Sequence, residues 1–221
     1  MIRALLLDLD NTLYPASATM EAEIVRRMNE YVARFLDLSF DEAAALRRER
    51  MPAYATTYEW LEAEHGFTDA DAYFDYVHPE GEEACLEPDP ALGPLLDGFD
   101  LPKYVFTNAP AAHADRVLAR LGVQGRFRRV FDIRFNGLRG KPHASAVDRV
   151  LAAVRADCGA EPAETAFVDD VPRYVRGFAD RGGLGILIDH HGRHAREGLP
   201  TIRLLAELPS TLAAAAEGRA R

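Results

Sequence analysis

The sequence predicts an α/β protein in which a parallel sheet with helices on both faces carries an inserted block of helices. Short apolar runs alternate with helix-like segments in the second half of the chain, as βαβ units require. Residues 16–87 show only helical periodicity. Acidic, hydroxyl and amide side chains follow several of the apolar runs, at the strand ends where open α/β sheets bind ligands.

The first expected element is a strand at Leu5–Leu7, a short apolar run typical of a strand buried on both faces. Asp8 and Asp10 follow it. Residues two apart in an extended chain share a side, so these carboxylates can converge on one point. Two negative charges at such a short distance favour a bound cation, and Mg²⁺ prefers carboxylate oxygens as ligands. The same tripeptide also fits a simple loop start, so other segments must decide between the two.

Residues 16–87 are expected to form a small helical domain, and residues 1–15 with 88–221 the α/β core. Apolar residues three and four positions apart predict its helices. They are expected at Met20–Leu36, Phe40–Arg50, Tyr58–His65 and Asp69–Val77. Pro88 and Pro90 mark one connection to the core, and Tyr14–Ala16 the other.

The second half of the chain is expected to supply the remaining strands and their crossover helices. Strands are predicted at Lys103–Phe106, Val130–Ile133, Thr165–Val168 and Leu184–Ile188, and helices at Ala111–Leu121, His143–Ala156 and Arg173–Arg181. Residues Thr201–Leu208 fit a last strand or a helical turn, and the alanine-rich stretch from Ala213 to Arg221 fits a helical tail.

Composition narrows the class of protein. The 221 residues are 48% hydrophobic and 28% charged, which is ordinary for a globular protein. A net charge of −9 argues against nucleic acid or an anionic membrane as the main partner, and it remains compatible with a small phosphorylated substrate. The two cysteines lack metal-site spacing. We expect a cytoplasmic protein, monomeric or homodimeric, without membrane or nucleic-acid partners.

The sequence DLDNT at residues 8–12 resembles the DxDxT motif of the haloacid dehalogenase-like (HAD) phosphohydrolase superfamily. The resemblance implies a Rossmann-like core and an aspartyl-phosphate mechanism. Asp8 would attack phosphorus, and Asp10 would act as general acid and base while its backbone carbonyl binds Mg²⁺. Thr107, which with Asn108 follows the run KYVF, is similar to the second motif, whose hydroxyl and nearby amides hold a phosphoryl oxygen.

Two further motifs complete the set. Lys141, in RGKPH, resembles the third motif, a lysine that pairs with Asp8 and the transferring phosphoryl group. Asp169 and Asp170, after a buried run, resemble the acidic fourth motif. The resemblance implies that Asp170 binds Mg²⁺ directly and that Asp169 acts through water or an outer contact. The predicted metal ligands are therefore Asp8, Asp10, Asp170 and Asp169.

The helical insertion has the position and length of the C1 cap of this superfamily, which closes over the active site. The DNTLYP, GKPH and FVDD sequences resemble the pyrimidine 5′-nucleotidase branch, which implies nucleoside 5′-monophosphate substrates. In the insertion, Tyr54 could stack on a base or sugar, Thr56 and Thr57 could donate hydrogen bonds, and His78 could approach an anion. Ala55 replaces the glycine of the similar segment in that branch.

Several alternatives remain open at this stage. The same motifs fit a phosphomutase, or a phosphatase for sugar phosphates or phosphoglycolate. A haloacid dehalogenase is disfavoured because Asp10 is present, and a non-catalytic binding protein because no motif residue is missing. His190, His191 and His194 could imitate a zinc site but lack a nearby cysteine or acidic ligand. Trp60 is expected in the core.

Overall fold

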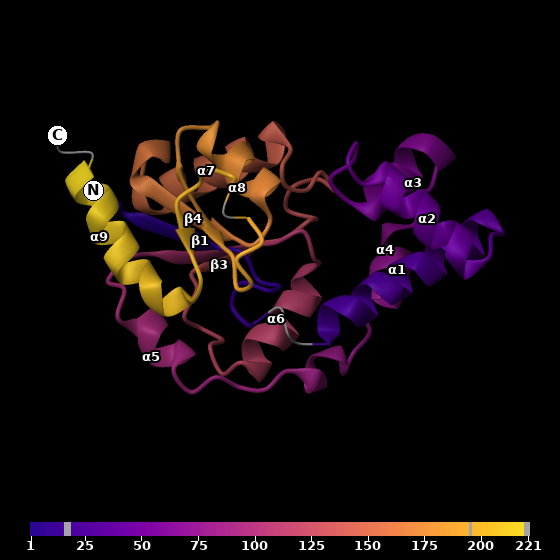
Figure 1. Cartoon of the computed structure of the whole chain (residues 1–221), viewed down its shortest axis with the longest axis horizontal. Coiled ribbons are helices and arrows are strands. Elements are labelled where there is room, and N and C mark those ends of the chain that lie inside the picture. Colours follow the sequence, from indigo (N-terminus) through magenta and orange to yellow (C-terminus); the bar gives the residue numbers. More distant parts are fainter. Residues whose placement is uncertain (16–18, 195, 219–221) are drawn as a thin grey trace.

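The computed structural model describes residues 1–15, 19–194 and 196–218. Its centre is a six-stranded, all-parallel sheet with strand order β3-β2-β1-β4-β5-β6 (Figure 1). The strands are β1 (Ala4–Leu7), β2 (Lys103–Phe106), β3 (Arg129–Phe131), β4 (Thr165–Asp169), β5 (Leu184–Ile188) and β6 (Thr201–Ile202). The predicted α/β fold is confirmed.

Helices connect the strands in the expected order. They are α1 (Met20–Leu36), α2 (Phe40–Arg50), α3 (Thr57–His65), α4 (Ala70–Val77), α5 (Leu92–Asp97), α6 (Ala111–Arg120), α7 (Ala144–Cys158), α8 (Pro172–Ala179) and α9 (Leu208–Gly218), with 3-10 turns η1 (Glu82–Cys85), η2 (Pro162–Glu164) and η3 (Leu205–Glu207). The predicted tail coincides with α9 as far as residue 218, and residues 219–221 lie outside the described part of the chain.

Three local differences from the prediction have physical reasons. Helix α5 was not expected, because Gly93 and Pro94 break up its short apolar pattern. Strand β3 begins and ends earlier than predicted, since Asp132 starts a turn by accepting the backbone N–H of Phe135 at 2.8 Å. The region 201–208 contains both a short strand, β6, and a helical turn, η3.

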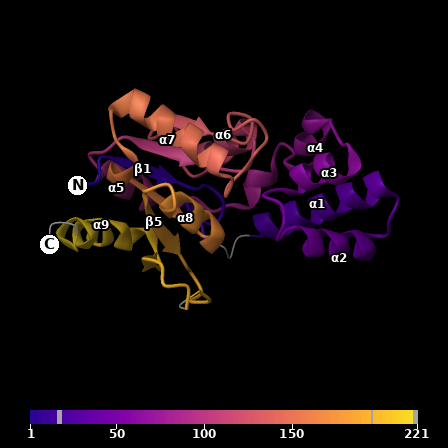
Figure 2. The same ribbon diagram turned by 90° about the horizontal axis from the view of Figure 1, so that it is seen from above.

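Apolar side chains cover both faces of the sheet. Leu6, Phe106 and Phe167 belong to one buried cluster with Val150 of α7 and Phe178 of α8. The opposite face packs against α5, α6 and α9 through residues of a second cluster, which includes Leu5, Val105, Leu96, Val117 and Leu208. The layers of helices on either side of the sheet are visible in Figures 1 and 2.

The four helices α1–α4, called the helical insertion below, lie beside the sheet in both views (Figures 1 and 2). Aromatic rings fill their interior: Tyr31 meets Tyr73 edge-on at 5.1 Å between centroids, and Phe67 at 5.6 Å. Trp60 is fully buried, as predicted. Within the described residues, no helix is both long enough and apolar enough to cross a bilayer.

Strand order brings three polar chain segments to one edge of the sheet. β1 is central, and its Leu7 is in register with Val105 of β2 and Val168 of β4. Parallel strands end at the same edge, so the residues that follow β1 and β2 meet the end of β4 there. The candidate site lies at this edge.

Candidate active site

The turn after β1 fixes the two aspartates of the first motif. The backbone N–H of Asp8 donates to Val168 at 2.9 Å, which continues the sheet ladder. Asn11 then takes a left-handed backbone conformation with φ of 60°, and the Leu13 N–H closes the turn on Leu9 at 3.0 Å. Thr12 Oγ1 lies 3.3 Å from Asp8 Oδ2 and donates to it. The Asp8 carboxylate is therefore held at the end of the strand.

Lys141 connects Asp8 with the acidic pair after β4. Its Nζ lies 2.6 Å from Asp8 Oδ1 and 2.7 Å from Asp169 Oδ2, and all three side chains are buried. Burial alone would lower the pKa of Lys141, but the charges of Asp169 and Asp8 outweigh it and raise the pKa above its usual value. Lys141 is thus a fixed cation at the base of the site.

Asp8, Asp169 and Asp170 form an acidic cluster whose ligand oxygens lie within 4.8 Å of one another. Burial, opposed by Lys141 and reinforced by Asp169, raises the pKa of Asp8 to about 7. Burial and the neighbouring carboxylates Asp169 and Asp8 likewise raise the pKa of Asp170 to about 8. One lysine cannot neutralise three carboxylates, so the cluster holds an excess of negative charge.

This donor set fits a hard divalent cation such as Mg²⁺, which prefers carboxylate oxygens. A second observation agrees: Asn11 Oδ1, beside the cluster, is a buried oxygen with no hydrogen-bond partner among the described residues. Asn11 Nδ2 donates to Asp170 Oδ2 at 3.4 Å. The Asp10 carboxylate, by contrast, is not part of the acidic cluster.

Thr107 and Asn108, at the end of β2, have different surroundings. Thr107 Oγ1 accepts the Ala109 N–H at 3.0 Å and lines the cavity described below. The Asn108 amide accepts the Lys141 N–H at 2.7 Å and donates to the Lys141 carbonyl at 3.1 Å. Both ends of this amide hold the Lys141 loop, and Asn108 also lines the cavity, so its contact with phosphate stays a prediction.

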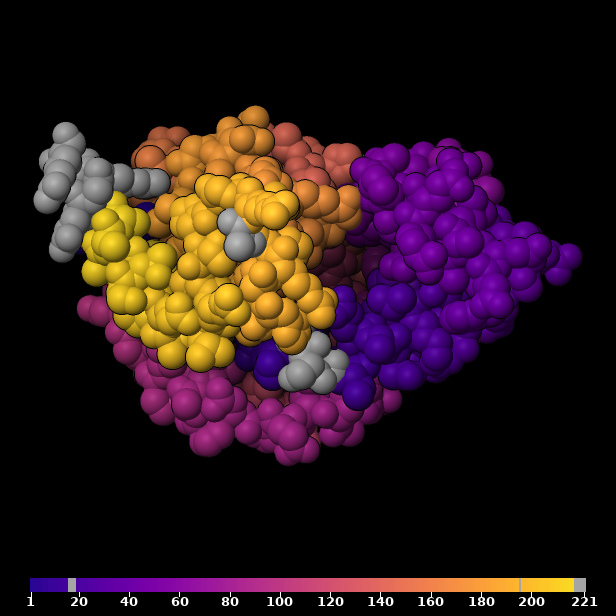
Figure 3. Space-filling view, in the orientation of Figure 1, coloured from indigo at the N-terminus to yellow at the C-terminus, as the bar shows by residue number. Residues whose placement is uncertain are grey.

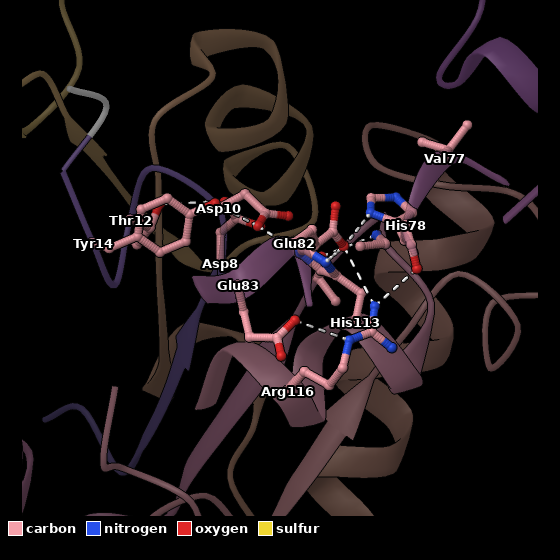
Figure 4. Close-up of polar contacts among 12 residues, drawn as sticks. Asp8, Asp10, Thr12, Tyr14, Val77, His78, Glu82, Glu83, His113 and Arg116 are labelled. Carbon is pink, nitrogen blue, oxygen red and sulfur yellow. Dashed lines mark hydrogen bonds and ion pairs between the residues drawn. The ribbon is translucent and has the colours of Figure 1, made fainter. Parts of the chain in front are cut away.

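Asp10 lies in a second polar network, which sequence reasoning missed (Figure 4). Its Oδ1 accepts the Tyr14 hydroxyl at 2.7 Å and lies 2.8 Å from His113 Nε2. On the other side of the ring, His113 Nδ1 lies 2.6 Å from Glu82 Oε1. His78 Nδ1 is 3.3 Å from the same Glu82 oxygen. The network joins the first motif to helix α6 and turn η1.

The charges of this network support one another. Burial alone would lower the pKa of His113, but Asp10 and Glu82 outweigh it and raise the pKa to about 10. Burial would raise the pKa of Asp10, yet His113 and the Tyr14 hydroxyl bring it down to about 2. Glu82 behaves in the same way: bonds from His113 and His78 overcome burial and lower its pKa to about 2. The histidine is thus a cation between two anions.

A cavity of about 290 Å³ lies above these groups, between the sheet and the helical insertion. Asp8, Asp10, Thr107, Lys141 and Asp170 line its base. Apolar side chains from the insertion, among them Ile24, Met28 and Met51, line the opposite wall. Figure 3 shows a hollow at this junction of the insertion with the rest of the molecule. The volume suits a small ligand.

Two arginines on the cavity wall have no carboxylate partner among the described residues. Arg47, from α2, donates through Nε to Thr57 at 2.7 Å and contacts the Met28 sulfur at 3.1 Å. Burial lowers its pKa, because no nearby anion offsets the loss of water. Arg173, from α8, donates to the backbone carbonyl of Met51 at 3.0 Å. Neither arginine was singled out from the sequence.

The predicted substrate contacts of the insertion divide into two groups. Thr56, Thr57 and His78 line the cavity. Tyr54 does not line it, because its hydroxyl donates to Glu64 on α3 at 2.9 Å. The expectation that Tyr54 stacks on a substrate is therefore not met by this arrangement. The Thr57 hydroxyl is already engaged by Arg47.

The histidines of the sequence HHGRH have a structural explanation. His190 Nε2 donates to the backbone carbonyl of Asn11 at 2.8 Å, which supports the turn after β1. Within residues 1–15, 19–194 and 196–218, the clusters able to hold a metal do not include these histidines.

Comparison with solved structures supports the same fold. Superposition on a HAD phosphatase from Thermococcus onnurineus gives a TM-score of 0.62 at 20% identity, covering 96% of this chain and 98% of the other. YfnB from Bacillus subtilis, solved bound to magnesium, gives 0.61 at 18% identity, covering 96% and 98%. L-2-haloacid dehalogenase from Xanthobacter autotrophicus, with chloropropionic acid covalently bound, gives 0.58 at 18% identity, covering 96% and 99%.

The sequence itself matches a family model. The family described as haloacid dehalogenase-like hydrolase matches residues 2–180, which include the whole helical insertion and every residue of the acidic cluster. The chain therefore belongs to the haloacid dehalogenase-like hydrolases.

Proposed function

We propose that this hydrolase is a Mg²⁺-dependent phosphomonoesterase that works through an aspartyl-phosphate on Asp8. The observation that carries the proposal is Lys141 Nζ, which lies 2.6 Å from Asp8 and 2.7 Å from Asp169 at the base of the cavity. A fixed cation beside a buried carboxylate suits the capture of a phosphoryl group and its in-line attack by that carboxylate.

Each residue at the cavity base has a role in this reaction. Asp8 attacks phosphorus, and Lys141 and the Thr107 hydroxyl bind the phosphoryl oxygens. Asp8 and Asp170 would hold Mg²⁺, which supplies charge neutralisation for the transferring group when it is bound. Asp169 holds Lys141 and, through Oδ1, the backbone N–H of Val171 at 2.8 Å. In this proposal Asp169 does not bind the metal directly, and it orients Lys141 and the backbone beside the metal site.

Asp10 is the proton carrier of the proposed reaction. Tyr14 and His113 both engage its Oδ1, so Oδ2 is the oxygen left to face the cavity. Because His113 and Tyr14 keep the pKa of Asp10 low, its carboxylate is ionised until the substrate binds. A phosphate monoester, whose second pKa is about 6, can bring the proton that Oδ2 passes to the leaving oxygen. The ionised carboxylate then takes a proton from the attacking water and returns it to the released phosphate. That water hydrolyses the aspartyl-phosphate and releases phosphate.

The helical insertion, taken as residues 16–87, acts as a C1 cap in this proposal. Its apolar side chains form the wall opposite Asp8 and keep water from the reacting groups. Exclusion of bulk water strengthens the electrostatic contacts to the transferring phosphoryl group, and the water that hydrolyses the aspartyl-phosphate enters after the leaving group has departed. A cap that opens for substrate exchange suits the polar contacts that join it to the core.

The substrate in this proposal is a small phosphorylated metabolite, with pyrimidine nucleoside 5′-monophosphates first because of the motif resemblance. Arg47 favours a second candidate class. A cation that has lost water without gaining a carboxylate is costly, and an anionic group of the ligand would offset that cost. Sugar phosphates with a second acidic group, and phosphoglycolate, supply such a group at a distance from the ester.

Phosphate release from a panel of substrates tests the proposal. The panel contains UMP, CMP, AMP, sugar phosphates and phosphoglycolate, each with Mg²⁺ and with EDTA. Metal-dependent release supports the chemistry, and the preferred compound identifies the substrate class. Phosphoryl transfer within a sugar phosphate without net release would indicate a mutase instead, and no reaction with any compound would contradict catalysis.

Replacing the nucleophile is the sharper experiment. We expect Asp8→Asn to lower turnover by at least about 10³-fold, since an amide oxygen does not attack phosphorus. Its melting temperature should stay close to that of the parent. Asp75→Asn, the same replacement at an exposed position of α4, serves as the control and should leave turnover unchanged. Turnover of Asp8→Asn close to that of the parent would contradict the assignment of Asp8 as the nucleophile.

A further inference from the structure

His113 occupies an unusual position for a helix residue of the core. It lies in the first turn of α6, it is fully buried, and both ring nitrogens contact carboxylates: Nε2 at 2.8 Å from Asp10 and Nδ1 at 2.6 Å from Glu82. Buried ion pairs of this kind are expensive to form unless the geometry is good. Apolar packing of α6 against the sheet does not require an imidazole at this position. The presence of a histidine there must therefore be explained by its contacts with Asp10 and Glu82.

Glu82 is held as firmly as His113. Its side chain is 1% exposed, and four groups surround its carboxylate. Arg27 of α1 lies 3.0 Å from Oε2, while His113, His78 and Arg116 contact Oε1 at 2.6, 3.3 and 3.4 Å. Arg116 also donates to the His78 carbonyl at 2.8 Å. Glu82 is therefore tied to the helical insertion and to α6 at once.

His78, Glu82 and His113 are close enough together to bind a metal ion. The surroundings favour a hydrogen-bonded network instead. Arg27 and Arg116 already place two positive charges on the Glu82 carboxylate, and a cation added there would be repelled. In addition, His113 uses Nε2 for Asp10, which requires the ring to face the first motif (Figure 4).

We infer that His113, held in place by Glu82, is a positioning residue that fixes Asp10 Oδ1 and thereby turns Oδ2 toward the reacting ester. The inference rests on the proposed function. Because Glu82 also binds Arg27 of α1, the position of the proton carrier depends on where α1 and turn η1 lie relative to α6. One chain of contacts thus joins α1, turn η1, α6 and the first motif.

Two replacements of His113 separate its contacts. Asparagine places its amide nitrogen near the position of Nδ1, so His113→Asn can still bond to Glu82 but cannot reach Asp10. Glutamine places its amide nitrogen near the position of Nε2, so His113→Gln can still donate to Asp10 but not to Glu82. The two variants remove the same charge, and only the first removes the contact that the inference requires.

The readout is the rate of enzyme phosphorylation in a single turnover with two substrates. UMP, or ribose 5-phosphate if UMP is not turned over, has an alkoxide leaving group that needs a proton. 4-Nitrophenyl phosphate has a leaving group that departs without one. We expect His113→Asn to slow the first reaction by about 100-fold and the second by less than about threefold. His113→Gln should lie within about tenfold of the parent on both.

Two further variants test whether the effect is specific to this network. One changes Glu82, and the other is a control on the same helix. Glu82→Gln keeps an acceptor for His113 but removes its charge, and should slow the alkyl ester reaction selectively. Arg120→Gln is the control, since Arg120 joins α6 to the Leu86 carbonyl at 2.7 Å without touching Glu82 or His113. It should leave both rates unchanged.

The outcomes are distinguishable. Equal losses on both substrates, or no loss, in His113→Asn and Glu82→Gln would overturn the inference, because a general structural defect does not discriminate between leaving groups. A parent protein that is phosphorylated by neither substrate would overturn the proposed function, and the inference with it. Selective loss on the alkyl ester, retained activity in His113→Gln and an unchanged Arg120→Gln support the inference.

Discussion

At the scale of single residues, the site combines charges that would not tolerate one another in isolation. Lys141 carries one positive charge beside two buried carboxylates, and Asp170 adds a third. Removing Lys141 would leave Asp8 and Asp169 buried without a cation, which costs more than the pair contributes. The groups therefore act as a unit, and single replacements are expected to have effects that do not add.

Metal dependence of stability follows from the acidic cluster. The folded protein keeps protons on Asp8 and Asp170 up to pKa values of about 7 and 8, against an ordinary value of 3.8. The unfolded chain releases them nearer pH 4, so the free energy of unfolding without metal falls as pH rises from about 4 to 8. Mg²⁺ binds the ionised form and offsets this loss.

We therefore expect the difference in melting temperature between Mg²⁺ and EDTA to grow steadily from pH 5 to pH 8. Calorimetric or fluorescence melts across this range measure it. Asp170→Asn should reduce both the pH dependence and the effect of Mg²⁺. A difference that stays constant across the range would contradict the assignment of the cluster as the metal site.

Arg47 should show opposite effects on stability and on activity. Arg47→Met removes a cation that lacks a carboxylate partner and leaves an apolar chain beside Met28 and Met51. We expect a melting temperature equal to that of the parent or higher by about 2–4 °C, since replacement of an uncompensated charge is neutral or stabilising. The value of kcat/KM should fall by about 10- to 100-fold.

Arg47→Lys is the matched variant, because it keeps the charge and should recover part of the lost kcat/KM. Steady-state kinetics on the best substrate, together with thermal melts, measure both effects. A clear drop in melting temperature with unchanged kcat/KM would show that Arg47 supports the fold and does not bind the ligand.

At the scale of elements, the chain segments after β1, β2 and β4 and the loop before α7 each present one part of the site. The loop before α7 depends on close backbone approach at Gly140. A Cβ atom there would lie 2.6 Å from Asn108 Oδ1, which itself accepts the Lys141 N–H. Only glycine allows the end of β2 and the Lys141 loop to approach this closely.

Gly140→Ala should therefore displace the Asn108 amide and, with it, Lys141. We expect at least about tenfold lower kcat, because a small misplacement of a catalytic group is costly, and a smaller effect on stability. Gly93→Ala is the control, since its added methyl meets only the flexible end of Arg126. Equal kcat for Gly140→Ala and the parent would show that the loop adapts without cost.

The sequence predicts these elements well where periodicity is strong and local. The strands around the first and fourth motifs, and the helices of the insertion, follow from apolar spacing alone. His113 was missed although a signal existed: it lies four residues before Val117, on the face of α6 that packs inward. A histidine on an apolar helix face predicts a buried polar group, and such a group requires hydrogen-bond partners.

Other site residues left no such signal. Glu82 lies in a short turn between Gly81 and Cys85, and its partner His113 is 31 residues away. Arg47 is one of several charged residues in α2, and nothing in that helix shows which arginine faces the cavity. Asn108 follows Thr107 in a motif that suggests phosphate binding, and nothing in the sequence shows that its amide also holds the backbone of a loop 33 residues later.

At the scale of the whole molecule, polar contacts join the helical insertion to the core around the cavity. Glu59 of α3 lies 2.6 Å from His143 and 3.4 Å from Arg139, and Arg139 reaches Glu62 at 3.0 Å. Such partly exposed ion pairs contribute little individually, which suits an interface that separates and closes repeatedly.

Arg139→Gln should weaken the closed arrangement without affecting the reacting groups. We expect KM to rise by about two- to fivefold at low salt, with kcat little changed, and the difference should shrink as salt screens the pairs. Steady-state kinetics at two ionic strengths measure this. Arg155→Gln, which breaks a 3.1 Å pair with Glu161 within the core, should change neither parameter. A fall in kcat without a rise in KM would argue against a role in closure.

The central position of β1 has a consequence for how the chain is made. This strand is synthesised before the rest of the sheet, and its partners β2 and β4 begin only at residues 103 and 165. The helices of the insertion have contacts that are local in sequence, so they can fold on the ribosome before β2 and β4 are available to pair with Leu5–Leu7. An unpaired apolar strand is prone to aggregation, and adjacent charges oppose it. Asp8 and Asp10 would then protect the nascent chain long before Lys141 and Asp170 are translated to complete the site.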